Sequence, residues 1–210
     1  MSSTVSIIPI VEGHGEVEAV PVLVRRIGYA LDPPVLPEVI RPIRVSRPKL
    51  LRANELERTV HLAARRVGSE GRILIIIDAD DDCPANFGPE LLKRAQKARP
   101  DVQVSVVLAK SEFESWFIAG ASGLAGQRGL SQTLSPLENP ESKRDAKSWL
   151  NAHMTNETYK ETSHQAAFAA CFDMAEARQR GAPHFSDSFD KFWRECQKLL
   201  RIPSPSDHQS

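Results

Sequence analysis

Short apolar runs recur along the first 120 residues of the chain and predict the strands of a sheet. The runs at 5–11 (VSIIPIV), 72–78 (RILIIID) and 102–109 (VQVSVVLA) are rich in β-branched residues. Such runs are typical of strands that are buried on both faces, as in parallel sheets. The segment 37–47 predicts a weaker strand at an edge, because prolines interrupt it.

Between these strands, apolar residues recur at steps of three and four, which predicts amphipathic helices. One helix extends from Val17 to Leu31, a second ends at Gly68, and a third spans 88–98 with Pro89 in its first turn. A fourth is expected to be capped by Ser111. This alternation of strands and helices predicts an α/β fold, with a mostly parallel sheet flanked by helices.

The composition changes after residue 120. The segment 122–144 is rich in glycine, serine and proline and predicts a long loop, and helices are expected at about 163–180 and 187–200. We therefore expect a sheet domain at 1–120, a loop with a helical extension packed on it at 121–202, and a disordered tail at 203–210.

Charge and cysteine content narrow the classes of function. The 210 residues contain 27 Lys and Arg and 27 Asp and Glu, so any affinity for nucleic acid must come from a local patch. The three cysteines form no CxxC pair, which favours a reducing compartment without structural zinc or disulfides. The N-terminus lacks the pattern of a signal peptide, and the longest aliphatic run, Ile73–Ile77, is too short to cross a bilayer. We expect a cytoplasmic protein without membrane contact.

Acidic residues follow three of the predicted strands. The first strand ends at Glu12, the stretch after Ile77 contains four aspartates, and two glutamates follow the last strand. The candidate site residues among these acids are Glu12, Asp78, Asp80, Asp82, Glu112 and Glu114. The carboxyl ends of parallel strands meet at one edge of a sheet. Clustered carboxylates repel one another, and a hard cation such as Mg²⁺ or Mn²⁺ removes that cost. The alternative is a solvated acidic turn.

Other phosphate- and metal-binding motifs fit less well. The stretch GHGEVE begins like a dinucleotide-binding fingerprint but has Glu18 at the third glycine position. Asp78, Asp80 and Asp82 imitate the start of an EF-hand loop, yet Cys83 stands where glycine is expected. An aspartyl phosphatase also has a DxD pair after a strand, but normally near the start of the chain.

A glutamate after the first strand with a DxD pair after a later one resembles the TOPRIM fold. The stretches IVEGHGEVEAVPVLVRRI, ILIIIDADDDCP and LAKSEFESWFIAG are most similar to a stand-alone, TOPRIM-like family of bacterial proteins related to the OLD-family (overcoming lysogenization defect) nucleases. The resemblance covers about residues 5–120. It implies a TOPRIM-like (Rossmannoid) sheet and a setting in antiphage defence or mobile elements.

The resemblance also implies a mechanism, which is hydrolysis of phosphodiester bonds with one or two Mg²⁺ or Mn²⁺ ions. Asp78 and Asp80 would hold one ion, and Glu12 would bind it or act as general acid or base. Glu16, Glu112 and Glu114 match further acidic positions of the family, near which a second ion would bind. Asp82 is an additional candidate metal ligand. Lys110 could neutralise phosphate charge or be a surface lysine. Family likeness alone suggests supporting roles for Tyr159, Thr162 and Gln165.

A basic segment at 41–52 is the candidate nucleic-acid surface. It contains no acid, and its cations are Arg41, Arg44, Arg47, Lys49 and Arg52. Such a patch suits contacts with the phosphate backbone, although an exposed edge strand also favours charge. The hypothesis is thus a Mg²⁺-dependent nuclease acting on DNA or RNA. Two alternative functions stay open, namely a non-catalytic TOPRIM-like subunit that binds a partner ATPase and a metal-dependent phosphatase. The chain could also form a dimer. Trp116 and Phe117 are expected in the core.

Overall fold

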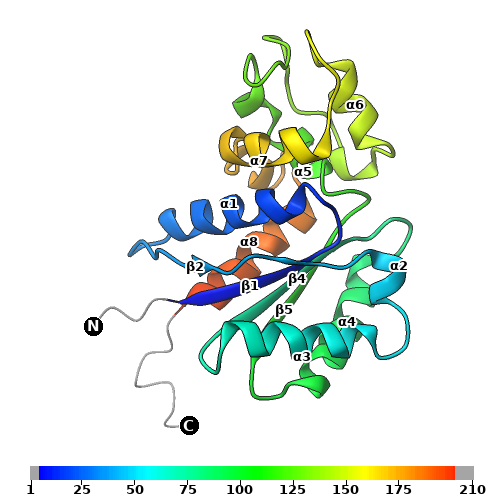
Figure 1. Cartoon of the computed structure of the whole chain (residues 1–210). Helices are drawn as coiled ribbons and strands as arrows, with labels where there is room; N and C mark the ends of the chain where they lie inside the picture. The colour runs from blue at the N-terminus through cyan, green and yellow to red at the C-terminus, as the bar shows by residue number, and fades with distance from the viewer. Residues whose placement is uncertain (1–4, 202–210) are drawn as a thin grey trace.

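The computed structural model describes residues 5–201 and forms an α/β fold around one parallel sheet (Figure 1). The sheet has the order β2-β1-β4-β5, with β3 also paired to β1, and every pairing is parallel. The strands are β1 (Ser6–Val11), β2 (Glu38–Val39), β3 (Ile43–Arg44), β4 (Arg72–Asp78) and β5 (Gln103–Ala109). The expected parallel sheet with flanking helices is confirmed.

Helices cover both faces of the sheet (Figure 1). One face is covered by α3 (Glu55–Val67) and α4 (Pro84–Ala98), and the other by α1 (Glu16–Tyr29) and α8 (Asp187–Leu200). Alternate residues of the strands enter two separate apolar clusters, one on each face. This is why the strand sequences are almost continuously apolar.

The chain after β5 forms a third group of short helices beyond the carboxyl ends of the strands. These are α5 (Ser115–Ala119), α6 (Ala146–Ala152) and α7 (Glu161–Cys171), with 3₁₀ turns at Ala121–Leu124, Pro140–Ser142 and Glu176–Arg178. Helix α7 packs along α1. The contact is so close that a Cβ atom at Gly15 would collide with Gln165 and with the carbonyl oxygen of Glu161. Glycine at this position therefore allows α7 to approach the start of α1.

Several predicted boundaries need correction. The fourth helix was expected to be capped by Ser111, but it begins at Ser115. Ser111 has a positive φ of 64°, and its hydroxyl donates to the carbonyl oxygen of Glu141. Helix α4 begins at Pro84, so Pro89 lies inside it and not in its first turn. The helix expected at 163–180 ends at Cys171.

Other predicted elements agree more closely with the structure. The helix at 187–200 is confirmed, with the Ser186 hydroxyl accepting the Phe189 N–H as its cap. The weak strand at 37–47 is two short strands, and a short helix, α2 (Arg47–Leu50), follows. Trp116 and Phe117 are fully buried, as predicted. The tail expected at 203–210 lies outside the described residues, and the division at residue 120 stays a prediction.

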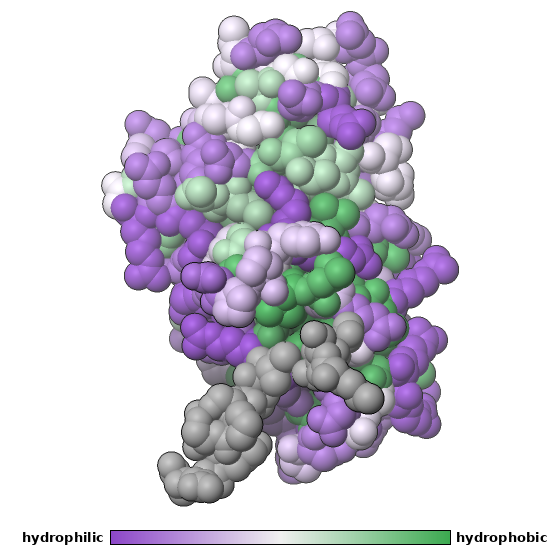
Figure 2. Space-filling model, turned by 90° about the vertical axis from the view of Figure 1, so that its left-hand side faces the viewer, coloured by the Kyte–Doolittle hydropathy of each residue, from purple (hydrophilic) through white to green (hydrophobic). Residues whose placement is uncertain are grey.

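The surface is mostly polar but not uniformly so. On the face shown in Figure 2, apolar residues occupy a central strip between hydrophilic margins. Tyr29 and Leu36 are large apolar side chains that remain exposed. Among residues 5–201, no helix has the length and apolar character needed to cross a membrane.

Candidate functional site

Four carboxylates from different elements converge where β1 and β4 end. Glu12 follows β1, Glu16 begins α1, Asp78 ends β4, and Glu114 immediately precedes α5. Glu16 and Glu114 are buried, with 3% and 0% of their surfaces exposed. We refer to Glu12, Glu16, Asp78 and Glu114 as the carboxylate cluster.

Backbone N–H groups hold three of these carboxylates in place. The N–H of Glu12 donates to Oε2 of Glu16 at 3.1 Å, and the N–H of Asp78 donates to Oε2 of Glu12 at 3.4 Å. The Asp78 carboxylate accepts the N–H of Phe113 at 2.8 Å. These bonds link the end of β1 to the end of β4 and to the segment after β5.

Glu114 is held by side chains from the C-terminal part of the chain. Its Oε1 atom accepts hydrogen bonds from the Tyr159 hydroxyl at 2.9 Å and from Nε2 of Gln165 at 2.8 Å. Its Oε2 atom is buried and has no hydrogen-bond partner among the described residues. Because a buried, unpartnered carboxylate oxygen is costly, this atom is a candidate ligand for a cation.

Burial and mutual repulsion disturb the ionisation of the whole cluster. Burial raises the pKa of Glu16 to about 8, and the negative charges of Glu114 and Glu12 add to this shift. Burial also raises the pKa of Asp78 well above its ordinary value, with further contributions from Glu16, Glu114 and Glu12. The pKa values of Glu12 and Glu114 are likewise raised, mainly by burial. Like charges are therefore close together in a poorly hydrated place.

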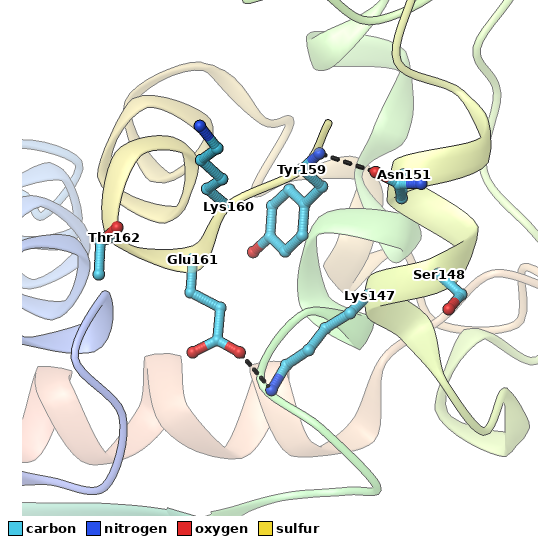
Figure 3. A pocket seen from close by; sticks show the side chains of 7 residues that line it. All are labelled: Lys147, Ser148, Asn151, Tyr159, Lys160, Glu161 and Thr162. Atoms are coloured by element: carbon cyan, nitrogen blue, oxygen red, sulfur yellow. Dashed lines mark hydrogen bonds and ion pairs between the residues drawn. The ribbon is translucent and has the colours of Figure 1, made fainter. Parts of the chain in front are cut away.

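Lys147 is a cation whose charge acts on the buried end of the cluster, at Glu114 and Asp78. Burial alone would lower its pKa, but its hydrogen bond to Glu161 and the charges of Glu114 and Asp78 raise the pKa above its ordinary range. Its Nζ atom lies 2.7 Å from Oε1 of Glu161. Figure 3 shows Lys147 from α6 and Glu161 from α7 pointing toward each other beside Tyr159. These residues line a pocket of about 470 Å³.

The aspartates of the loop after β4 are paired with arginines. Arg47 contacts Asp80 at 3.0 Å and also pairs with Asp82, while Arg144 contacts Asp81 at 2.6 Å. Arg47 additionally donates to the carbonyl oxygen of Ala79 at 3.4 Å. Two arginines of the chain itself thus neutralise part of the negative charge of these three aspartates.

The predicted acids consequently divide into two places. Asp80 and Asp82 belong to a second pocket of about 610 Å³, together with Lys110, Glu112 and Arg144. Glu112 accepts the backbone N–H of Asp145 at 3.1 Å. Glu112 and Glu114, which were predicted to act together, therefore lie in different surroundings. Of the seven acids predicted to bind metal, the structure brings together four, which are Glu12, Glu16, Asp78 and Glu114.

The basic segment lies beside this edge of the sheet, but its cations are not equivalent. Arg41, Arg44, Lys49 and Arg52 are exposed. Arg47, by contrast, is largely buried, with 15% of its side chain exposed, and is engaged with the acidic loop. Its guanidinium also lies over the Phe87 ring, 5.9 Å from the ring centroid. Arg47 thus binds the protein's own aspartates in this structure, and its predicted contact with nucleic acid stays a prediction.

The chemistry of the cluster suits a hard divalent cation, whereas its geometry is incomplete. All of its donors are oxygen atoms, and Oε2 of Glu114 is buried without a partner. However, within residues 5–201 no group of three His, Cys, Asp or Glu side chains is arranged so that it could hold a metal ion. Side chains of the cluster would have to turn toward an ion for it to bind.

Sequence reasoning missed Lys147 and had no residue-based argument for Tyr159 and Gln165. Lys147 lies on α6, a helix of seven residues within a stretch without clear periodicity. The hydrogen bonds from Tyr159 and Gln165 to Glu114 span 45 and 51 residues. A polar glutamine on the buried side of a helix is a weak signal for such a contact, and only the fold supplies its partner.

Comparison with known families identifies a match that covers most of the chain. Residues 11–192 match the profile described as "Domain of unknown function (DUF4276)", which covers most of the chain and crosses from the sheet into α8. No curated protein and no solved structure matches the chain.

Proposed function

The chain belongs to the DUF4276 family, and we propose that it is a metal-dependent nuclease that hydrolyses phosphodiester bonds of DNA or RNA. The observation that carries this proposal is the carboxylate cluster. Its members lie at the carboxyl ends of parallel strands, where ligands bind in open α/β sheets. Their raised pKa values mark a place where an additional positive charge would be stabilising.

Mg²⁺ or Mn²⁺ is the cofactor that these oxygen donors fit, and the proposal allows one ion or two. When bound, such an ion supplies polarisation of a phosphate oxygen and makes water a stronger acid. Glu12 and Asp78 would hold it, and the unpartnered oxygen of Glu114 is a further donor. Glu16, which keeps a proton near neutral pH, could pass that proton to or from a reacting group.

Cations of the chain are placed to attract a phosphate backbone toward this edge. Arg44 lies beside the cluster, because its Nη1 atom is 3.5 Å from the carbonyl oxygen of Glu12. Arg41, Lys49 and Arg52 continue the exposed positive charge along the basic segment. Lys147 of α6 adds a positive charge that acts on Glu114 and Asp78. These contacts would be independent of base sequence and sensitive to salt.

The likeness of three stretches to TOPRIM proteins and OLD-family nucleases supports the same activity and is the basis for proposing a role in antiphage defence or mobile elements. A second candidate is a non-catalytic subunit that binds a partner such as an ATPase. Two observations favour it. The first is that Arg47 forms an ion pair with the Asp80 carboxylate. The second is that the described residues contain no group of three His, Cys, Asp or Glu side chains arranged to hold a metal ion.

The test is an assay of cleavage with matched variants. Purified protein is incubated with circular DNA, linear DNA and structured RNA, in Mg²⁺, in Mn²⁺ and in chelator. We expect cleavage that requires the metal and that is lost in Glu12→Gln and Asp78→Asn. Glu18→Gln, which neutralises an exposed glutamate in the first turn of the same α1 helix, is the control and should cleave normally.

Two results would remove the nuclease proposal. One is the absence of cleavage of every substrate by folded wild-type protein under all metal conditions. The other is cleavage by the Glu12→Gln variant at the wild-type rate, which would point to a contaminating enzyme. Either result would leave the non-catalytic subunit as the better explanation of the site.

A further inference from the structure

A groove at the outer edge of β5 lies away from the carboxylate cluster and has a different character. Its volume is about 530 Å³, and it lies between α4 and α8. Its lining includes Val106 and Leu108 of β5, Ala85, Pro89 and Leu92 of α4, and Arg194 of α8. β5 is the last strand of the sheet, and in the part of the chain that the structure describes no strand pairs with its outer side.

We propose that this groove binds an extended segment of a partner protein, with alternating acidic and apolar side chains, as an additional strand beside β5. An unpaired edge strand offers a row of backbone N–H and C=O groups, which is the basis of peptide recognition by strand addition. Val106 and Leu108 of β5 line the groove, and Lys110 directly after the strand lines it too, so a short extended peptide would pair with this half of β5. The apolar residues of α4 provide a wall against which alternate side chains can pack.

The charge around the groove determines the chemistry of the partner. Lys110, Lys191 and Arg194 line it, against a single carboxylate at Asp187. Lys191 pairs with Glu195, and Arg194 pairs with Asp190. Each of these carboxylates also binds other cations, because Lys198 contacts Glu195 and both Arg178 and Arg180 contact Asp190. This side of the groove is therefore positively charged, which favours an acidic segment.

The same charge argues against a second copy of this chain as the occupant. A symmetric dimer through β5 would place the cationic side of one groove against the cationic side of the other, and like charges placed together disfavour association. An acidic partner segment has no such cost. The inference concerns a surface distinct from the carboxylate cluster and does not depend on nuclease activity.

The probe is a short, fluorescently labelled peptide in which valine and aspartate alternate. We expect the wild-type protein to bind it in fluorescence anisotropy, with affinity that falls as salt rises, and to bind a valine–lysine peptide at least tenfold more weakly. Ala85→Glu places bulk and negative charge in the groove and should weaken binding at least tenfold. Ala170→Glu, at an exposed alanine of α7, is the matched control and should bind like the wild type.

A second measurement locates the peptide. Hydrogen exchange should slow in the segment from Val106 to Lys110, which lines the groove, when the peptide is bound, because an added strand protects its outward-facing amides. Equal binding by Ala85→Glu and wild type, with both folded by circular dichroism, would overturn the proposal. So would equal affinity for the two peptides, or protection confined to another element. Sedimentation that shows a dimer broken by Ala85→Glu would instead assign the groove to a second copy.

Discussion

Replacing Glu16 by glutamine should make the protein more stable at neutral pH and less sensitive to pH. The folded state raises the pKa of Glu16 to about 8, compared with an ordinary value of 4.5. The folded chain therefore binds this proton more tightly than the unfolded chain does. The stabilisation is complete below pH 4.5 and is lost progressively as the pH rises toward 8. Glutamine has nearly the shape of protonated glutamate and cannot ionise.

The size of the effect follows from the shift and the burial. One pKa unit corresponds to about 1.4 kcal/mol, so the stability lost between pH 4.5 and pH 7, where the folded chain still holds the Glu16 proton and the unfolded chain has released it, is about 3 kcal/mol. Little of this is screened by solvent, because only 3% of Glu16 is exposed. For a chain of 210 residues, 3 kcal/mol corresponds to a change of roughly 6–12 °C in the melting temperature.

The assay is chemical unfolding of wild type and Glu16→Gln in chelator, at several pH values between 5 and 8.5. The free energy of unfolding of the wild type should fall across this interval, also because Asp78 and Glu114 have raised pKa values. The Glu16→Gln curve should fall less steeply and lie above the wild-type curve at pH 7. Glu18→Gln should follow the wild type, since Glu18 is exposed. Parallel curves for Glu16→Gln and wild type would refute this account of the cluster.

Two further substitutions test the core and the acidic loop. Trp116→Ala should lower the free energy of unfolding by about 3–5 kcal/mol, because Trp116 is fully buried and packs against Phe113 and Phe192. Denaturant titration measures this loss. The control is Tyr29→Ala, which removes an exposed aromatic side chain and should change the free energy of unfolding by under about 0.5 kcal/mol. Arg47→Ala removes the ion pair to Asp80 and should strengthen binding of Mn²⁺ severalfold. A spectroscopic titration without nucleic acid measures this affinity. Unchanged or weaker binding would mean that Arg47 does not compete with a metal ion.

The sequence was informative wherever a local pattern determines position. Three apolar runs were enough to predict the parallel sheet, and the carboxyl ends of such strands fall on one edge. That rule alone brings Glu12 and Asp78 together. It does not determine the direction in which a side chain points within a loop. Asp80, with a positive φ of 49°, pairs with Arg47 instead of joining the cluster.

Other features depend on contacts that no local pattern contains. Glu114 is positioned by hydrogen bonds from residues 45 and 51 positions later. Lys147 lies on a helix too short to have a clear periodicity. The start of α5 was misplaced because Ser111 is a good helix cap by residue type, yet its hydroxyl donates to the carbonyl oxygen of Glu141. Tertiary partners, and not propensity, decided these cases.

The bonds from Tyr159 and Gln165 to Glu114 also bear on the order in which the site forms. When only the sheet has been synthesised, Glu114 lacks both donors, because residues 159 and 165 have not yet been added to the chain. The complete cluster would then exist only after the C-terminal helices have docked on α1. A nascent or truncated chain would present its acids without the hydrogen bonds that orient Glu114, so assembly of the site would mark the end of folding.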